Sequence, residues 1–349
     1  MAAIASIPES LRLRLIKSPR QRWLVTGCAG FIGSHLVENL LSAGQTVVGI
    51  DNFATGSQRN LDLALAGLSP QERAQFEFHE LDICATGLLP LFAGVQHVLH
   101  QAALGSVPRS VQDPMASIRA NVDGFNYVLN AARLHGVPRL VYASSSSVYG
   151  DNTDLPKLEA KVGQVLSPYA GTKAANELFA GVFSRTYGIQ TVGLRYFNVF
   201  GPRQDPQGAY AAVIPRWIME LRAGSVPKIN GDGTNSRDFC FVANAVQANI
   251  LAAISPSLPT TNAVFNIACE KQTDLNELFD LIAKGLDKFD SNEIPIERAK
   301  KPSYGPNRAG DVPHSLANID LAKSSLGYAP EFGIDVGLEA TIQWYVSNS

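Results

Sequence analysis

The most constraining feature of this chain is a glycine-rich turn between an apolar run and a helical pattern. The run at residues 23–26 ends at Gly27, and Gly30 and Gly33 follow at three-residue intervals. Glycines at this spacing let the backbone turn sharply and approach a pyrophosphate, which the free N–H groups of a helix N-terminus can bind. The sequence therefore predicts a strand, a tight turn and a helix that together bind a dinucleotide.

An acidic residue after the next apolar run indicates which dinucleotide is bound. Residues 46–50 form an apolar run that stops at Asp51, about 20 residues after the glycines. A carboxylate there can bind both ribose hydroxyls of NAD and repels the extra phosphate of NADP. Because glycine clusters also mark ordinary turns, the NAD prediction depends on the flanking strands and on Asp51.

The composition sets the size of the fold and excludes some partners. The chain has 349 residues, of which 46% are apolar, enough to bury a large core and to form two lobes. A net charge of −2 without a basic block gives no indication of a nucleic-acid partner. Four cysteines without CxxC spacing indicate free thiols in a reducing compartment, with no metal site.

Residues 1–21 predict a short helical extension ahead of the first strand. They mix apolar residues with Arg12, Arg14 and Lys17. They contain neither the apolar centre of a signal peptide nor the span of about 20 apolar residues that a membrane helix needs. We therefore expect an amphipathic helix, no membrane partner and a cytoplasmic location.

Strands and helices alternate along residues 22–197. The strand-like runs are 76–81, 95–100, 140–145 and 190–194, and the helical patterns are near 61–68, 118–135 and 168–187. This alternation predicts an α/β fold with a Rossmann-type, doubly wound parallel sheet, whose ligands bind beyond the carboxyl ends of the strands. The candidate residues at these ends are Gly27, Asp51, Asp82, Gln101 and Ser145.

From residue 198 the pattern changes, because glycine, proline and polar residues interrupt shorter elements. We expect residues 198–349 to form mainly a smaller α/β lobe that binds the substrate, with excursions of the chain back to the NAD-binding domain. Its clearest helices are predicted at 242–254 and 275–286.

A tyrosine and a lysine four residues apart provide the candidate catalytic pair. Ser167 is a plausible helix N-cap and Pro168 suits the first helical position, so Tyr169 and Lys173 face the same way on one helix. A nearby ammonium and an oxidised nicotinamide favour the phenolate, whose free pKa is near 10. YxxxK also occurs by chance on helix surfaces. The serine run 144–147 at a strand end can bridge a substrate hydroxyl to the tyrosine, or it could be an ordinary turn. Only the conjunction of the NAD site, these serines and YxxxK is specific.

With the NAD site, the strand-end serines and the YxxxK pair following one another in this order, the chain resembles the extended short-chain dehydrogenases/reductases. It resembles specifically their nucleotide-sugar 4-epimerase branch. Within that branch it is similar to the bacterial UDP-N-acetylglucosamine 4-epimerases of surface-polysaccharide pathways. The segments that carry the resemblance are residues 100–103, 105–110, Asn121, 194–201, 208–215, 231–233, 236–239 and 308–311.

The resemblance implies a role for each matching residue. The implied NAD-binding residues are Gly27, Gly30, Phe31, Ile32, Gly33, Asp51, Asn52, Asp82, Ile83, Gln101, Ala102, Asn121, Tyr169 and Lys173. The implied catalytic group is Tyr169 as base, Lys173 as its electrostatic partner, Ser145 as the proton-bridging hydroxyl, and Ser147. The implied substrate-binding residues are Ser106, Arg109, Ser145, Ser146, Asn198, Arg237, Arg308, Asp311 and Ser315.

The implied reaction is reversible epimerisation at C4 of a UDP-sugar through a 4-keto sugar, with tightly bound NAD. Sugar 4,6-dehydratases carry an Asp-Glu pair where this chain has Ser146 and Ser147, so dehydration is disfavoured. Ser315 replaces a tyrosine that closes the pocket in epimerases restricted to UDP-glucose and UDP-galactose, which leaves room for a 2-N-acetyl group.

Other interpretations remain open at this point. UDP-N-acetylglucosaminuronic acid is the alternative substrate, with Arg109 as a conceivable carboxylate partner or, instead, a residue that stabilises the start of the following helix. A non-catalytic NAD-binding regulator is a distant alternative, since both Tyr169 and Lys173 are present. We also expect a homodimer with a four-helix interface formed by residues 118–135 and 168–187.

Overall fold

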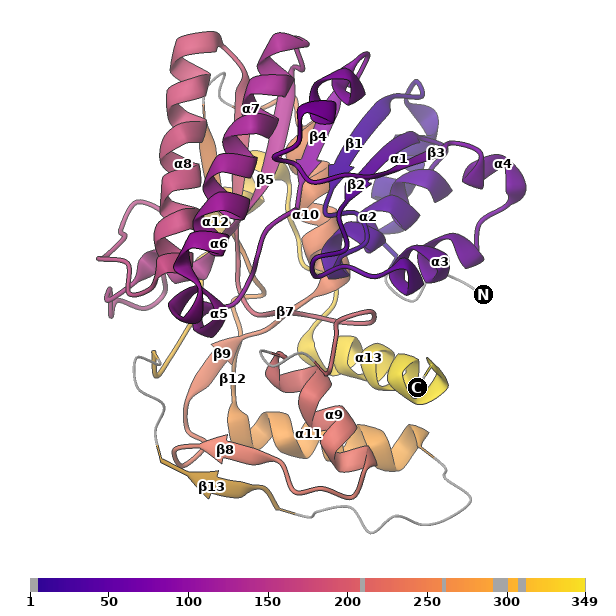
Figure 1. Cartoon of the computed structure of the whole chain (residues 1–349). Helices are drawn as coiled ribbons and strands as arrows, with labels where there is room; N and C mark the ends of the chain where they lie inside the picture. The colour runs from indigo at the N-terminus through magenta and orange to yellow at the C-terminus, as the bar shows by residue number, and fades with distance from the viewer. Residues whose placement is uncertain (1–5, 208–210, 259–261, 291–300, 307–311, 349) are drawn as a thin grey trace.

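A seven-stranded parallel sheet forms the centre of the molecule (Figure 1). The computed structural model describes residues 6–207, 211–258, 262–290, 301–306 and 312–348. The strands, in sheet order, are β3 (Phe76–Glu80), β2 (Thr46–Asp51), β1 (Arg22–Thr26), β4 (His97–His100), β5 (Arg139–Ser145), β6 (Gln190–Tyr196) and β11 (Ala263–Ile267). The order reverses between β1 and β4, where doubly wound sheets bind ligands. The predicted Rossmann-type fold is confirmed.

Helices cover both faces of this sheet. One face carries α2 (Phe31–Ser42), α10 (Val242–Ile254) and α12 (Asp320–Leu326), and the other carries α7 (Gly124–Leu134) and α8 (Pro168–Tyr187). The helix predicted at 168–187 is confirmed. The one predicted at 118–135 is helical but interrupted, because a π-helical turn at Arg119–Asp123 separates α6 (Pro114–Ile118) from α7.

The C-terminal part of the chain builds a smaller lobe below the sheet in Figure 1. It contains α9 (Val213–Arg222), β8 (Lys228–Asn230), β9 (Ser236–Asp238), β12 (Gln272–Asp274), α11 (Leu275–Phe289), β13 (Ser303–Gly305) and α13 (Ile334–Asn348). β8 pairs with β13 in parallel and β9 pairs with β12 in antiparallel. The chain crosses back to the sheet at α10, β11 and α12, so the two lobes are interleaved in sequence.

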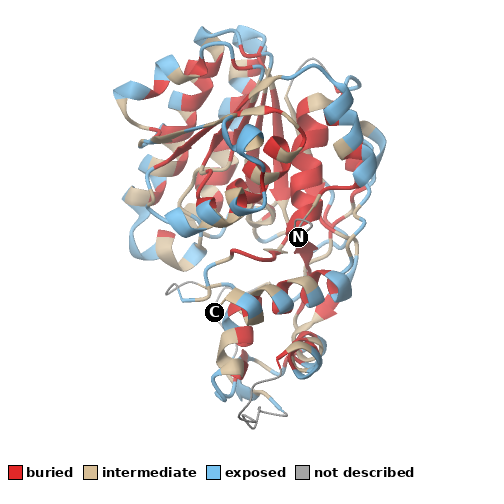
Figure 2. Ribbon diagram, turned by 90° about the vertical axis from the view of Figure 1, so that its right-hand side faces the viewer, coloured by how far each residue is buried: buried red, intermediate tan, exposed pale blue. Residues whose placement is uncertain are grey.

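Burial is greatest in the sheet and in the helix α10 that packs on it (Figure 2). Every residue of α10 from Val242 to Ala253 is buried. Its polar Asn249 is satisfied, because its Nδ2 donates to the Tyr196 hydroxyl at 2.7 Å. The helix therefore reaches the carboxyl edge of the sheet with a polar side chain as well as an apolar surface.

The remaining elements are short and complete the connections. They are α3 (Gln58–Ala66), α4 (Pro70–Arg73), α5 (Val107–Gln112), β7 (Val199–Phe200) and β10 (Cys240–Phe241). In the described ranges, no helix combines the length and the apolar character that crossing a bilayer requires. The four cysteines are free thiols.

The predicted N-terminal helix is present as α1 (Glu9–Lys17). Leu11 and Leu15 are buried and Leu13 is exposed, which is the amphipathic arrangement. The chain around α1 is tied to the sheet layer by two side chains: Asn39 accepts from the Ile7 N–H at 3.0 Å, and Gln45 donates to the Leu15 carbonyl at 3.2 Å. The extension is therefore part of the core.

We predict that Leu15→Ala lowers the free energy of unfolding by about 2–5 kcal/mol, because it leaves a cavity in the core. Leu15 is 2% exposed, whereas Leu13 on the same helix is 42% exposed. Leu13→Ala is the matched control and should change stability by less than about 0.5 kcal/mol. Urea unfolding of both variants measures the difference, and equal effects would show that α1 does not contribute to the core.

Candidate active site

The glycine turn brings β1, α2 and β4 into contact with one another. Gly27 has φ +67°, and a Cβ there would lie 2.7 Å from the backbone nitrogen of Ala102. A Cβ on Gly33 would lie 2.0 Å from the Gly27 carbonyl oxygen. A side chain is thus excluded at Gly27 and at Gly33, and α2 begins at Phe31 after Gly30, with no side chain capping its N-terminus. This end of α2 can bind a pyrophosphate with its backbone N–H groups.

Asp51 ends β2 beside this turn with its carboxylate already oriented. One oxygen accepts from the Ala29 N–H at 2.9 Å and the other from the Phe53 N–H at 2.8 Å. Burial raises the pKa of Asp51 above its usual value, and these backbone bonds oppose that shift. Each carboxylate oxygen can accept a further bond, so the group is available to two ribose hydroxyls.

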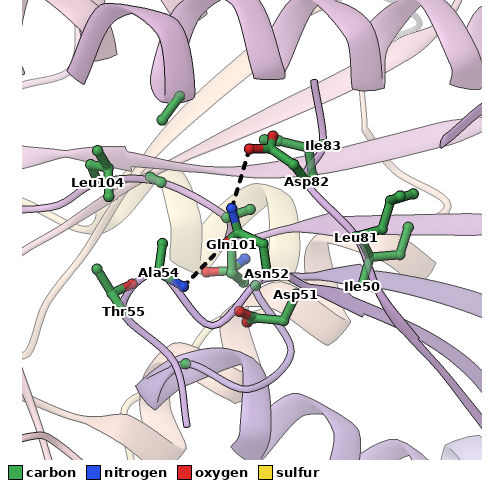
Figure 3. A pocket seen from close by; sticks show the side chains of 15 residues that line it. Ile50, Asp51, Asn52, Ala54, Thr55, Leu81, Asp82, Ile83, Gln101 and Leu104 are labelled. Carbon is green, nitrogen blue, oxygen red and sulfur yellow. Dashed lines mark hydrogen bonds between the residues drawn. The ribbon is translucent and has the colours of Figure 1, made fainter. Parts of the chain in front are cut away.

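Asn52 and Asp82 are joined across the carboxyl ends of β2 and β3 (Figure 3). Asn52 donates to Asp82 at 3.3 Å and accepts from the Ala54 N–H at 3.1 Å. They border a cavity of about 100 Å³. The predicted cofactor residues that line it are Gly27, Gly30, Asp51, Asn52, Asp82, Ile83, Gln101 and Ala102. The close turn at Gly27, the uncapped end of α2 and Asp51 together fit NAD.

Two of the predicted cofactor residues have amides that are bonded within the protein. Gln101 donates to Asn249 at 2.9 Å and accepts from the Tyr196 hydroxyl at 3.0 Å. Asn121 binds both backbone groups of Leu104 and donates to the Thr172 hydroxyl. These side chains position the loop after β4, so they shape the cavity through its backbone.

The candidate catalytic hydroxyls form a chain at the end of β5. The Ser147 hydroxyl donates to Ser145 at 2.9 Å, and Ser145 lies close enough to the Tyr169 hydroxyl to lower its pKa. The Lys173 ammonium donates to the Ala143 carbonyl at 2.8 Å and lies 5.9 Å from the Tyr169 ring centroid. A proton can therefore pass between a bound hydroxyl, Ser145 and Tyr169.

Local sequence signals place this pair, as predicted. The Ser167 hydroxyl accepts from the Ala170 N–H at 3.1 Å, and Pro168 begins α8. Burial raises the pKa of Tyr169, although the bond to Ser145 lowers it. Burial also lowers the pKa of Lys173 to about 8. Tyr169 therefore needs a further positive charge beside it to act as a base near neutral pH.

A buried ion pair behind the serines was not found by sequence reasoning. Glu177 pairs with Arg195 at 2.8 Å and accepts from Ser144 at 2.6 Å, and Arg195 donates to the Tyr149 hydroxyl at 3.1 Å. Glu177 lies four residues after Lys173 on α8, a spacing that could have revealed it. The network holds the end of β5 against α8.

A second cavity, of about 300 Å³, adjoins the serine turn. The predicted substrate residues that line it are Ser146, Asn198, Arg237 and Ser315, together with the predicted catalytic Ser147. Arg237 donates from Nη1 to the carbonyls of Ser236 and Pro313, each at 2.9 Å. The Ser315 N–H donates to the Ser236 carbonyl at 3.0 Å. Ser315 is thus held beside Arg237 at the cavity wall.

The other predicted substrate residues are either absent from the described cavity lining, as are Ser106, Arg109 and Ser145, or lie outside the described residues. Ser106 caps α5 by accepting from the Arg109 N–H at 3.3 Å, and neither residue is in the cavity lining. Arg308 and Asp311 lie outside the described residues. Lys157 and His314 line the cavity, and no sequence pattern had singled them out.

Comparison with known proteins gives the family. Residues 23–268 match the NAD dependent epimerase/dehydratase family. The chain belongs to this family. NAD is its cofactor, in agreement with the prediction from Gly27, Gly30, Gly33 and Asp51.

Three similar proteins cover nearly the whole chain. A UDP-glucose 4-epimerase of Mycolicibacterium smegmatis is 36% identical over 94% of this chain and 99% of its own length. UDP-glucuronate 4-epimerase 4 of Arabidopsis thaliana is 33% identical over 97% of this chain and 78% of its own. The structure of a UDP-N-acetylglucosamine 4-epimerase from Methanobrevibacter ruminantium M1, in complex with UDP-N-acetylmuramic acid, is 35% identical with a TM-score of 0.85, covering 95% of this chain and 100% of the other.

We predict that Gly33→Ala weakens NAD binding, because the new Cβ would collide with the Gly27 carbonyl. An overpacking cost of about 1–3 kcal/mol that falls on the NAD-bound state raises the Kd for NAD by about 5- to 150-fold. Gly67→Ala is the control, since a Cβ there meets nothing within 4 Å and its φ is −83°. The NAD released from each purified protein on denaturation measures the effect; full occupancy in Gly33→Ala would contradict the role of the close approach.

Proposed function

We propose that this protein inverts the C4 configuration of a UDP-N-acetylhexosamine, reversibly and with bound NAD. The observation that carries the proposal is the hydroxyl chain of Tyr169, Ser145 and Ser147, because Ser147 lines the cavity that contains Asn198 and Arg237. C4 epimerisation of a UDP-sugar is also the activity in the names of the three similar proteins. Surface-polysaccharide precursor synthesis is the proposed use of the product.

In this mechanism Tyr169 receives the proton of the C4 hydroxyl, directly or through Ser145. The Lys173 ammonium stabilises the developing phenolate. Bound NAD would supply the hydride chemistry at C4. Tyr169 gives the proton back when the carbonyl of the 4-keto sugar is reduced, so no proton is gained or lost over the cycle.

Inversion requires that the hexose turn over while the nucleotide stays in place. Arg237 and Asn198 are proposed to hold the diphosphate, where a guanidinium suits paired phosphate oxygens. Asn198 is fixed by its bond to the Asp238 carbonyl at 3.1 Å. The cavity of about 300 Å³ gives the hexose room to turn. Most of the binding energy therefore belongs to the nucleotide.

Elimination of water is not proposed, because the cavity lacks the acid that it would need. Ser146 and Ser147 stand where sugar 4,6-dehydratases carry an Asp-Glu pair. The described residues that line the cavity include no aspartate or glutamate. A serine hydroxyl is too weak an acid to protonate a leaving hydroxyl near neutral pH.

The acetylated substrate is proposed from Ser315. This small side chain lines the cavity, where it would leave space for a 2-N-acetyl group. The similar protein from Methanobrevibacter ruminantium M1 also has an N-acetylated sugar in its name. The uronic acid is a second candidate, favoured by the buried Lys157 in the same lining.

A homodimer is proposed through α7 and α8, which pack against each other. Exposed apolar side chains lie on both helices, among them Tyr127, Leu134, Leu178 and Phe179. Two copies of this face would make a four-helix interface and remove the apolar side chains from water.

The direct test is proton NMR of the purified protein with UDP-N-acetylglucosamine and no added cofactor. We expect the C4 epimer to accumulate to a stable ratio, and Tyr169→Phe to abolish the reaction because it removes the base. Mass spectrometry checks that no product has lost water. A dehydrated product, or an unchanged substrate with NAD bound, would overturn the proposal.

The size of residue 315 should set the choice between sugars. We predict that Ser315→Tyr lowers kcat/KM for UDP-N-acetylglucosamine by about 10- to 100-fold, because the ring fills the space for the acetyl group. The kcat/KM for UDP-glucose should change by less than about threefold, because this sugar has no acetyl group for the ring to displace. Equal losses for both sugars would contradict the pocket assignment.

A further inference from the structure

Lys157 is a buried cation in the wall of the sugar cavity that the proposed mechanism does not use. It lies in the connection between β5 and α8 and is 4% exposed. It lines the cavity together with Ser146, Ser147 and Ser315. A buried charge is costly unless an opposite charge or polar groups compensate it, so its partner in the working enzyme needs an explanation.

The backbone of Lys157 is paired with the segment that carries Ser315. The Lys157 N–H donates to the Leu316 carbonyl at 2.7 Å, and the Asn318 N–H donates to the Lys157 carbonyl at 3.0 Å. Lys157 and Ala317 are thus a parallel bridge pair. Paired residues and residues two positions apart share one face of a β ladder, so Lys157 and Ser315 present their side chains on the same face.

The protein supplies little negative charge to this ammonium. Its Nζ donates to the Asn152 carbonyl, and an ammonium has three donors. Asp154 is the acidic group whose charge acts on Lys157, and it is exposed and paired with Lys161 at 3.6 Å. Burial lowers the pKa of Lys157. The described part of the cavity lining offers it no carboxylate.

A bound substrate can supply the missing anion in two ways. The diphosphate is one, but Arg237 and Asn198 are proposed to hold it. The sugar is the other, since Lys157 lines the same cavity as the serines and Ser315 and is not in the lining of the dinucleotide cavity. A carboxylate accepts charge-assisted hydrogen bonds from an ammonium, and these are stronger than bonds to a neutral hydroxyl.

We propose that Lys157 binds a carboxylate on the hexose, so that the acidic N-acetylhexosamine nucleotide is the preferred substrate. This rests on the proposed C4 epimerisation and names its substrate class. The ammonium binds the carboxylate in the ground state and in the transition state alike, so its contribution falls mainly on KM. A neutral N-acetylhexosamine leaves the ammonium without an anion.

The test compares UDP-N-acetylglucosaminuronic acid with UDP-N-acetylglucosamine as substrates of the NAD-loaded protein. In the unmodified protein, kcat/KM should be at least about tenfold higher for the acid. Lys157→Met keeps the length of the stem and removes the charge. Lys157→Met should lower kcat/KM for the acid by about 10- to 100-fold, chiefly by raising KM. Its kcat/KM for the neutral sugar should change by less than about threefold.

Lys161→Met is the matched control, because it removes an exposed lysine from the same connection. Lys161→Met should turn over both sugars at the rates of the unmodified protein. The amount of bound NAD and the melting temperature should be unchanged in both Lys157→Met and Lys161→Met. Equal losses for the two sugars in Lys157→Met would assign Lys157 to the diphosphate or to the fold and overturn the proposal.

The unmodified protein gives a test that does not depend on a variant. Equal or lower kcat/KM for the acid than for the neutral sugar would overturn the role of Lys157 and leave C4 epimerisation intact. Epimerisation of neither sugar, with NAD bound, would instead overturn the proposed function and this inference with it.

Discussion

The close approach of the Gly27 carbonyl to Gly33 is the contact on which the rest of the site depends. With 2.0 Å between that oxygen and a hypothetical Cβ on Gly33, only glycine allows α2 to begin directly over the end of β1. The same turn brings Gly27 against the backbone of Ala102 at the end of β4. The helix end, Asp51 and the loop after β4 consequently face a single space.

Buried polar networks then fix the second cavity relative to the first. The amides of Gln101 and Asn249 and the hydroxyl of Tyr196 connect β4, α10 and β6. On the other face of the turn, Arg203 pairs with Glu38 and is bonded to the His35 ring, both on α2. Because buried pairs are costly to break, these contacts hold the segment that follows residue 198 against α2.

Local patterns in the sequence were sufficient for strands β1 to β6 of the sheet and for the placement of Tyr169 and Lys173 on α8, but they did not reveal the π-helical turn at Arg119–Asp123 or that α10, predicted as part of the smaller lobe, packs on the sheet. The bounds of α8 and α10 were predictable because capping, helical spacing and apolar runs act within a few residues. The direction of the Gln101 and Asn121 amides was not predictable, since their partners come from α10 and α8. The sequence did not predict a role for Lys157, because its place in the cavity wall depends on its pairing with Ala317, 160 positions away along the chain.

The electrostatics of the catalytic pair link base strength to the state of the cofactor. Burial alone raises the pKa of Tyr169 and lowers that of Lys173 to about 8, which opposes the formation of a phenolate. An oxidised nicotinamide adds the positive charge that favours the phenolate, whereas the reduced ring is neutral. In the proposed mechanism, Tyr169 would therefore be the stronger base beside oxidised NAD and the stronger acid beside reduced NAD. The proton affinity of Tyr169 would then follow the oxidation state of the cofactor in each half of the proposed reaction.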